Sequence, residues 1–316
     1  MVRILIVTPA PPGSRKGNRL TAVRWARLQR NLGYSVRVTQ HYEDQPCDLL
    51  IALHARRSAA AVRRFCDRHP EKPCILALTG TDLYRDLRRS ATAQRSLERA
   101  TWLVVLQPGG LQLIPNEQRN KAHVIYQSAT AVQRRDPLKK VFEICVLGHL
   151  RREKDPFRAA MAVRDVPESS RIKVVHLGAA LGSAMEQRAL AEMQTNPRYQ
   201  WLGELSHGKT KQRLARARLM VLSSRMEGGA NVVSEALAAG VPIVSSRISG
   251  SLGILGNDYP GYFKVGDTAR LTELLVRAEN DERWYRQLTA RCQRLARLVT
   301  PHREQAAWAK LLRLCG

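Results

Sequence analysis

Short apolar stretches alternate with amphipathic ones along most of the chain. In the first half the apolar stretches predict strands over 3–8, 35–40, 48–53, 74–79, 102–106 and 123–126. In the second half they predict strands over 142–148, 172–178, 199–203, 219–224, 241–246 and 262–265. Apolar runs of this length, separated by helical patterns, are typical of parallel strands buried on both faces of a sheet. The sequence therefore predicts an α/β protein built of two similar units.

The predicted helices are located by their capping residues. A helix over 18–31 is expected to end at Gly33, because glycine tolerates the left-handed conformation that closes many helices. Asp267 and Asp281 are typical N-caps and predict two helices near the end of the chain. Further helices are expected to begin at about Pro156, Ser183, Lys209 and Asn231.

The polar, basic stretch over 128–140 is interpreted as a linker. It divides the chain into an N-terminal Rossmann-like domain over 1–135 and a C-terminal Rossmann-like domain over 136–300. The basic amphipathic helix over 301–316 completes the chain. Ligands of doubly wound sheets bind at the carboxyl ends of the strands. A central cleft between the two domains is therefore the expected site.

Composition narrows the class of protein. The 316 residues are 44% hydrophobic and 25% charged, which excludes a disordered chain. No apolar stretch reaches the 18 residues or so of a membrane span, and the first apolar run is too short for a signal peptide. A soluble, cytoplasmic protein is expected. The six cysteines form no CxxC pair, so we expect reduced and mostly buried thiols.

The formal net charge of +25 leaves three interpretations open. The basic surface could bind nucleic acid, attract anionic lipid, or surround a site whose ligands are anions. The basic residues are spread along the chain and not gathered in a tail. Aromatic residues are only 5%, so the alternation of aromatic and basic residues found in single-strand binders is absent. Charge alone does not decide the function.

The most informative segment lies between a predicted strand and a predicted helix. Glu227, Gly228 and Gly229 come before the helix that begins at Asn231. Adjacent glycines let backbone N–H groups approach a phosphate closely. Glu235 follows Glu227 by eight residues, a helical rise of ~12 Å, which is too far for two carboxylates to share a proton or a metal ion. The spacing suits the two ends of an elongated ligand such as a nucleotide sugar, although isolated acids near a helix N-terminus are also common on protein surfaces.

The segment EGGANVVSE, followed by ALAAGVPIVSS, resembles the E-x7-E signature of the retaining GT-B glycosyltransferases of family four. WLGEL (201–205) and GHLRREKDP (148–156) fit the same family. The resemblance implies a GT-B fold in which Glu227 contacts the donor sugar and Glu235 holds the ribose hydroxyls. Further donor-binding residues implied by it are Gly148, His149, Leu202, Gly203, Gly228, Gly229, Ala230 and Asn231.

One position departs from the family pattern. The family's phosphate-binding motif has Gly, then Arg, and then Lys five residues after the Arg. Here Gly148 and Lys154 match the motif, but His149 stands at the Arg position. Either Arg151 or Arg152 would supply the missing charge beside the departing UDP diphosphate. The predicted catalytic residues are Lys154, Arg151, Glu227 and Asp82.

A narrower resemblance spans the chain. The segments VTPAPPGSRKGNRLTAVRWARLQ (7–29), ALHARRS (52–58), ALTGTDLYRDL (77–87), IYQSA (125–129) and NDYPGYF (257–263) are similar to the selenosugar synthases of selenoneine biosynthesis. This resemblance implies transfer of N-acetylglucosamine or glucose from a UDP-sugar to the selenium of selenophosphate. It also implies that the N-terminal domain binds the acceptor and that the last helix crosses back to that domain.

The acceptor is expected to be held by donors and cations, since selenophosphate is already an anionic nucleophile and needs positioning more than a base. No DxD triplet is present, so neither a metal site nor an obligatory cofactor is predicted. The candidate acceptor-binding residues follow three strands of the first half: Ser14, Arg15, Lys16, Gly17, Asn18, His54, Arg56, Arg57 and Thr81.

Two other functions stay open. One is a GT-B glycosyltransferase acting on a hydroxyl acceptor, such as a lipid, with the basic surface docked on a membrane. The other, from a different class, is a nucleic-acid-binding module on a degenerate GT-B fold, and the intact EGGANVVSE segment and Lys154 argue against it. A UDP-sugar epimerase would share the fold. UDP-sugar and selenophosphate remain the predicted partners, with no nucleic acid and no stable membrane insertion.

Overall fold

The computed structural model describes residues 1–14, 17–80 and 82–316. The chain forms two compact units. Unit 1 comprises Met1–Ser128 together with Pro301–Gly316, and unit 2 comprises Ala129–Thr300. The predicted linker over 128–140 contains neither helix nor strand. Each unit is described below by itself.

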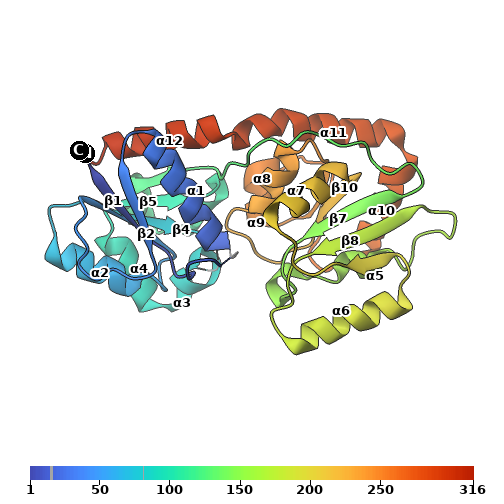
Figure 1. Cartoon of the computed structure of the whole chain (residues 1–316), viewed down its shortest axis with the longest axis horizontal. Coiled ribbons are helices and arrows are strands. Elements are labelled where there is room, and N and C mark those ends of the chain that lie inside the picture. Colours follow the sequence, from blue (N-terminus) through green and yellow to red (C-terminus); the bar gives the residue numbers. More distant parts are fainter. Residues whose placement is uncertain (15–16, 81) are drawn as a thin grey trace. The chain divides into compact units, whose positions relative to one another are not determined.

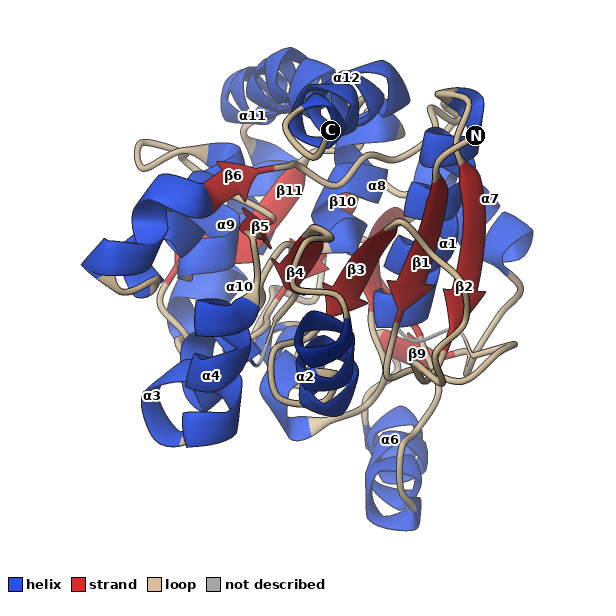
Figure 2. Cartoon of the chain, turned by 90° about the vertical axis from the view of Figure 1, so that its left-hand side faces the viewer, coloured by secondary structure: helices blue, strands red, loops and turns tan. Residues whose placement is uncertain are grey.

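The strands of unit 1 form one parallel sheet of six described strands, in the order β2-β1-β3-β4-β5-β6. Figure 2 shows these strands running side by side, with α2 and α4 next to them. The strand bounds are β1 (Arg3–Val7), β2 (Ser35–Thr39), β3 (Leu49–Leu53), β4 (Cys74–Leu78), β5 (Trp102–Val105) and β6 (Ala122–Val124).

Alternate residues of these strands enter two separate cores, because successive side chains of a strand point to opposite faces of the sheet. Leu5 and Val7 pack with side chains of α2 and α4, whereas Ile4 and Ile6 pack with side chains of α1 and α12. Both faces of the sheet are thus covered. This explains why the inner strands β3 and β4 are apolar at every position, whereas the edge strand β2, with the sequence SVRVT, alternates with polar residues.

The helices of unit 1 include the last helix of the chain. Trp308 of α12 packs edge-on against Trp25 of α1, with 4.7 Å between ring centroids. Both indoles are fully buried, so α12 is part of the core of unit 1 (Figure 1). The helix bounds are α1 (Gly17–Asn31), α2 (Ala59–Arg68), α3 (Leu87–Arg89), α4 (Ala91–Arg99) and α12 (Pro301–Arg313), with a π-helical turn η1 (Asp82–Asp86) and two 3-10 segments, η2 (Pro108–Leu113) and η3 (Asn116–Lys121).

Unit 2 repeats the architecture with strand order β12-β11-β10-β7-β8-β9, all parallel within its described residues. Its strands are β7 (Phe142–Leu147), β8 (Ile172–Leu177), β9 (Tyr199–Trp201), β10 (Leu219–Leu222), β11 (Ile243–Ser246) and β12 (Tyr262–Phe263). Its helices are α5 (Arg158–Ala162), α6 (Ser183–Thr195), α7 (His207–Arg216), α8 (Asn231–Ala238), α9 (Ser249–Leu255), α10 (Thr268–Asn280) and α11 (Glu282–Ala296), with two 3-10 turns, η4 (Arg152–Lys154) and η5 (Arg297–Val299).

The predicted doubly wound architecture is confirmed. Every predicted strand is present, with bounds within two residues of those expected. The predicted N-caps are also present, since Asp267 accepts a hydrogen bond from Arg270 N and Asp281 accepts one from Trp284 N. The helix expected at Pro156 begins instead at Arg158, because the residues before it form the η4 turn and its exit.

The six cysteines are free thiols, as expected from their spacing. Cys47, Cys74, Cys145 and Cys292 are buried, and the other two are partly exposed. Among the described residues, no helix has both the length and the apolar character needed to cross a membrane.

Candidate functional site

Lys154 and Glu227 form an ion pair between the loops that follow β7 and β10. The side chains are 16% and 12% exposed, respectively, so the pair is largely shielded but not fully buried. Ser224 Oγ donates a hydrogen bond of 2.8 Å to the same carboxylate oxygen of Glu227. The structure therefore brings together two of the four predicted catalytic residues, from positions 73 residues apart in the sequence.

Backbone contacts fix the loop that carries Lys154. Ser223 Oγ donates to the carbonyl oxygens of Lys154 and Asp155, at 3.1 and 2.9 Å. Asp155 has a left-handed backbone with φ of 45°, which ends the η4 turn, and its carboxylate accepts a hydrogen bond from Arg158 Nε at 3.0 Å. The Lys154 side chain is thus held by a short, sharply turned loop tied to the end of β10.

Two glycines allow close backbone approach beside this pair. A Cβ on Gly250 would lie 2.2 Å from the carbonyl oxygen of Glu227, and a Cβ on Gly178 would lie 2.1 Å from that of Gly148. Neither distance is possible for a side chain, so only glycine fits either position. The turn at Glu227 and the loop at Gly148 are therefore pressed against neighbouring backbone, which restricts their motion.

His149 stands at the position where the family motif has Arg, and its side chain forms a hydrogen bond with the backbone. Its Nδ1 accepts a hydrogen bond of 3.1 Å from Ala179 N, which links the loop after β7 to the loop after β8. Nδ1 is therefore unprotonated in this arrangement. Arg151, the predicted replacement for the missing charge, is exposed at the start of η4.

A buried histidine, His176, links the loop after β7 to β9. It lies at the end of β8, accepts a 3.0 Å hydrogen bond from the Tyr199 hydroxyl at Nδ1, and donates one of 3.0 Å from Nε2 to the carbonyl of Gly148. Burial lowers the pKa of His176 to about 4, so the ring is neutral at pH 7. The loop over Leu202 and Gly203 joins this network through bonds from Leu202 N to His176 O and from Gly178 N to Gly203 O.

We predict that His176 makes the stability of unit 2 depend on pH. Its pKa is near 6.5 when unfolded and about 4 when folded, so its contribution is fully present above pH 6.5 and is lost as the pH falls toward 4. The expected loss is ~3 kcal/mol of unfolding free energy, measured by urea unfolding at several pH values. His176→Gln should lack this part of the pH dependence of the unfolding free energy, whereas a variant at an exposed histidine, His302→Gln, should keep it. Equal slopes for the parent and His176→Gln would contradict the assignment.

The helix α8 begins at Asn231, so the residues Gly228 to Ala230 form the loop that precedes it. This corrects the expected ~12 Å separation of Glu227 and Glu235, because Glu227 lies outside the helix and the helical rise applies only from Asn231 onward. Glu235 lies four residues into α8 and is partly buried. Gly228 and Ala230 are buried at the N-terminus of α8, where helices stabilise anions.

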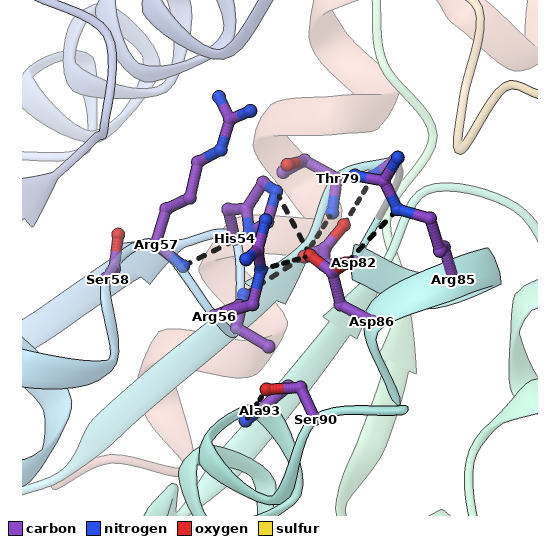
Figure 3. A network of polar contacts seen from close by, with 12 residues as sticks. His54, Arg56, Arg57, Ser58, Thr79, Asp82, Arg85, Asp86, Ser90 and Ala93 are labelled. Atoms are coloured by element: carbon purple, nitrogen blue, oxygen red, sulfur yellow. Dashed lines mark hydrogen bonds and ion pairs between the residues drawn. The ribbon is translucent and has the colours of Figure 1, made fainter. Parts of the chain in front are cut away.

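In unit 1, Asp82 is a fully buried carboxylate that binds backbone groups of two loops. It accepts hydrogen bonds from Ala55 N at 3.0 Å, Gly80 N at 2.8 Å and Thr79 N at 3.3 Å. These donors belong to the loops after β3 and β4 (Figure 3). With its oxygens directed at these N–H groups, Asp82 holds two strand ends together, which is the geometry of a positioning residue.

Next to it, Asp86 contacts three side chains, two of which, Arg56 and His54, are predicted acceptor residues. Its carboxylate accepts hydrogen bonds from Arg56 Nε at 2.9 Å and Arg85 Nε at 3.3 Å, and His54 Nε2 lies 3.9 Å away. Burial raises the pKa of Asp86, but the hydrogen bonds from the two arginines outweigh burial and hold the pKa below its ordinary value. The guanidinium group of Arg57 points away from this cluster (Figure 3).

His54 has an unusual backbone for a non-glycine residue, with φ of 78°. Three bonds hold the conformation: His54 N to Ala77 O at 2.9 Å, Ser58 N to His54 O at 3.0 Å, and Arg57 N to His54 Nδ1 at 3.3 Å. Burial lowers the pKa of His54, so the ring is neutral at pH 7. A strained residue held in this way is common at functional sites.

Three of the remaining predicted acceptor residues, Ser14, Gly17 and Asn18, lie around the start of α1. Ser14 donates from its backbone to Pro11 O at 3.2 Å, and Gly17 and Asn18 open the helix. Arg15, Lys16 and Thr81 lie outside the described residues. Within the described ranges, no group of three or more His, Cys, Asp or Glu side chains could hold a metal ion.

The sequence analysis missed three residues that support these sites: Ser224, Asp86 and His176. The spacing of Asp82 and Asp86, four residues apart, was an available signal, since residues at i and i+4 share a helix face. His176 was available as a polar residue inside an apolar strand. Ser224 had no signal, because its contact with Glu227 depends on how the loop folds.

Comparison with known proteins assigns the second half of the chain to a described group. A family model described as "Glycosyl transferases group 1" matches residues 130–297, which is more than half of the chain. Among curated proteins, the putative teichuronic acid biosynthesis glycosyltransferase TuaC of Bacillus subtilis (strain 168) is 24% identical over 284 residues. The match covers 83% of this chain and 69% of TuaC.

Solved structures share the fold over the whole chain. HepE of Anabaena, solved in complex with UDP and glucose, superimposes with a TM-score of 0.79 at 15% identity, covering 99% of this chain and 100% of HepE. Sucrose-phosphate synthase of Thermosynechococcus elongatus gives a TM-score of 0.80 at 14% identity, covering 99% and 98%. At these identities the likeness establishes the fold, in agreement with the predicted GT-B class.

Proposed function

Since this chain belongs to the group 1 glycosyltransferases, we propose that it transfers a sugar from a UDP-sugar to selenophosphate and so forms a carbon–selenium bond. N-acetylglucosamine and glucose are the proposed sugars. The observation that supports a UDP-sugar donor is the Lys154–Glu227 pair beside the N-terminus of α8. Selenophosphate as the acceptor is supported by the sequence resemblance and by the cationic loops of unit 1.

Each donor-site residue has a proposed role. Lys154 and the backbone N–H groups at the N-terminus of α8 hold the diphosphate, because both stabilise negative charge. Glu227 contacts the sugar, and Glu235 accepts hydrogen bonds from the ribose hydroxyls. The loop over Leu202 and Gly203 faces the base. HepE, which shares the fold, was solved with UDP and glucose, and this supports a UDP-sugar as donor.

In the proposed reaction a selenium lone pair attacks the anomeric carbon of the sugar. The bond from that carbon to the diphosphate oxygen breaks, and its electrons leave with UDP. The first product is a sugar joined through selenium to phosphate, and attack of water on the phosphorus then releases phosphate and the selenosugar. Selenophosphate enters as an anion, so no base is needed to activate it, and Lys154 stabilises the charge that develops on UDP.

In unit 1, Asp82 and Asp86 act as positioning residues in this proposal. Asp82 holds the loops after β3 and β4 at a fixed separation, and Asp86 orients Arg56 beside His54. Arg56, Arg57 and the neutral His54 then offer N–H donors to the acceptor anion. Pre-oriented donors lower the cost of bringing an anionic nucleophile into place.

A hydroxyl acceptor is the second candidate. The name of TuaC, a relative over 83% of this chain, refers to teichuronic acid biosynthesis and favours a saccharide acceptor. The two candidates share the donor site and differ only in the group that attacks the anomeric carbon. The choice between them therefore rests on the acceptor alone.

Release of UDP tests the proposal directly. We expect UDP-N-acetylglucosamine or UDP-glucose to release UDP rapidly only when selenophosphate is added. We also expect the reaction to continue in EDTA. Release that is stimulated by saccharide hydroxyls but not by selenophosphate would support the second candidate. Complete loss in EDTA, restored by Mg²⁺, would contradict a reaction without an obligatory divalent metal.

A further inference from the structure

A cavity of about 720 Å³ opens in unit 1 beside the carboxyl ends of β1 and β2 and the start of α2. Arg57 lines this cavity, and its guanidinium group points away from the Asp86 cluster (Figure 3). We call it the arginine basin, after four of the side chains that line it: Arg57, Arg63, Arg64 and Arg68.

The arginine basin has an excess of positive charge: its described lining holds four arginines and one carboxylate, Asp67, which is itself paired with Arg99. Arg64 and Arg68 share one carboxylate, Asp44, at 2.9 Å from Arg64 Nε and 2.9 Å from Arg68 Nη1. The hydrogen bond from Arg64 holds the pKa of Asp44 below its ordinary value. Within the described residues no carboxylate lies at ion-pair distance from Arg57 or Arg63. Like charges lining one cavity repel each other, and an anionic ligand would offset this repulsion.

The guanidinium groups are spread along the basin. Arg64 and Arg68 lie one turn apart on α2, which rises 1.5 Å per residue, and Arg57 precedes the first turn of that helix. The side chains therefore follow more than two helical turns, ~12 Å or more along the axis. One tetrahedral anion contacts only part of such a row. The cavity volume is also in the range of sites for whole small molecules, ~300–1,000 Å³.

A neutral polar side chain, Tyr42, also lines the arginine basin. It is 5% exposed, and its hydroxyl has no hydrogen-bond partner among the residues that the structure describes. A buried hydroxyl without a partner is costly, so an acceptor oxygen at this position would be stabilising. The unpaired hydroxyl is a polar feature of the lining that is independent of the charge count.

We propose that the arginine basin binds an elongated small molecule that carries two or more oxyanion groups, either phosphates or carboxylates. Arginine is suited to both, because its planar fork of N–H donors matches them in pairs. This goes beyond the proposed sugar transfer, since selenophosphate has a single tetrahedral group and would fill a small part of the basin. The ligand contacts Arg57, whose neighbour Arg56 is bound to Asp86, so its binding bears on the acceptor loop.

Isothermal titration calorimetry at ~150 mM salt tests the proposal with four probes: tripolyphosphate, trigalacturonate, inorganic phosphate and neutral maltotriose. Physiological salt is used because a chain of charge +25 attracts any polyanion at low salt. At least one of the two linear polyanions, tripolyphosphate or trigalacturonate, should bind ten times more tightly than inorganic phosphate, and which one binds identifies the oxyanion. Maltotriose should not bind.

Matched variants separate the basin from diffuse attraction. Arg63→Gln should weaken binding of the favoured polyanion about tenfold, as expected for loss of a charged hydrogen bond. Tyr42→Phe, which changes no charge, should weaken it several-fold. Arg95→Gln, an exposed arginine on the neighbouring helix α4, should leave affinity within twofold of the parent. Equal weakening by Arg63→Gln and Arg95→Gln, or equal affinity for phosphate and both linear polyanions, would overturn the proposal. UDP release by selenophosphate is measured separately, so either proposal can fail alone.

Discussion

Replacing Lys154 with methionine is expected to lower kcat/KM for UDP release about 100- to 1,000-fold, as removal of one preorganised charge donor does in other enzymes. The Lys154 side chain is 16% exposed and is held against Glu227 by the loop that Ser223 ties to the end of β10. In its proposed role it would meet the departing diphosphate with little reorganisation. Because the charge develops in the transition state, the effect should fall mainly on kcat. Steady-state kinetics with the preferred UDP-sugar measures it.

Two controls make this result specific. Lys264→Met removes an exposed lysine of the same unit and should leave kcat/KM unchanged. The double variant Lys154→Met/Glu227→Gln should lose little more activity than Lys154→Met alone, because residues that act as a pair are strongly non-additive. Activity of Lys154→Met close to that of the parent would contradict the proposed role.

Removing the Glu304 carboxylate is expected to have the largest effect on stability. The side chain is fully buried and accepts hydrogen bonds from Trp25 Nε1 at 2.7 Å, Arg24 Nε at 3.0 Å, and both the backbone N–H and the hydroxyl of Ser128. Glu304→Ala leaves all of these donors unpaired inside unit 1. Breaking a buried pair of this kind costs about 3–5 kcal/mol, so Tm should fall by roughly 10 °C.

Calorimetry and urea unfolding measure this loss. Glu304→Gln keeps some of the hydrogen bonds and should lose less than Glu304→Ala. Glu117→Ala, at an exposed position of the same unit, should change the free energy of unfolding by less than ~0.5 kcal/mol. A loss of under 1 kcal/mol for Glu304→Ala would show that the carboxylate does not hold the end of the first segment to α12.

The fold was predictable because it depends on patterns that repeat locally. Runs such as 49–53 and 74–78 are apolar at every position, which is what a strand between two layers of helices requires. Half of the donor site was predictable for a similar reason. Glu227 and the glycines before Asn231 are neighbours in the sequence, so their proximity does not depend on tertiary structure.

The contacts that support the site depend on tertiary packing and could not be predicted. Glu304 belongs to the basic amphipathic helix at the end of the chain, and nothing in its sequence context marks it as buried. The packing of Trp308 on Trp25 places it in the core of unit 1. His176 stands out in the sequence as a polar residue of an apolar strand, but its partners do not. Its role appears only when the loop over Gly148 lies beside it, with bonds to residues 28 and 23 positions away.

The mass of the product formed from UDP-N-acetylglucosamine and selenophosphate tests the central claim most directly. Selenium gives a broad isotope pattern that marks any product containing it. The proposed reaction predicts a selenium-bearing N-acetylhexosamine that forms together with UDP in equal amounts and is absent without the enzyme. UDP release with N-acetylglucosamine found only as the free sugar or on a hydroxyl acceptor would contradict carbon–selenium bond formation.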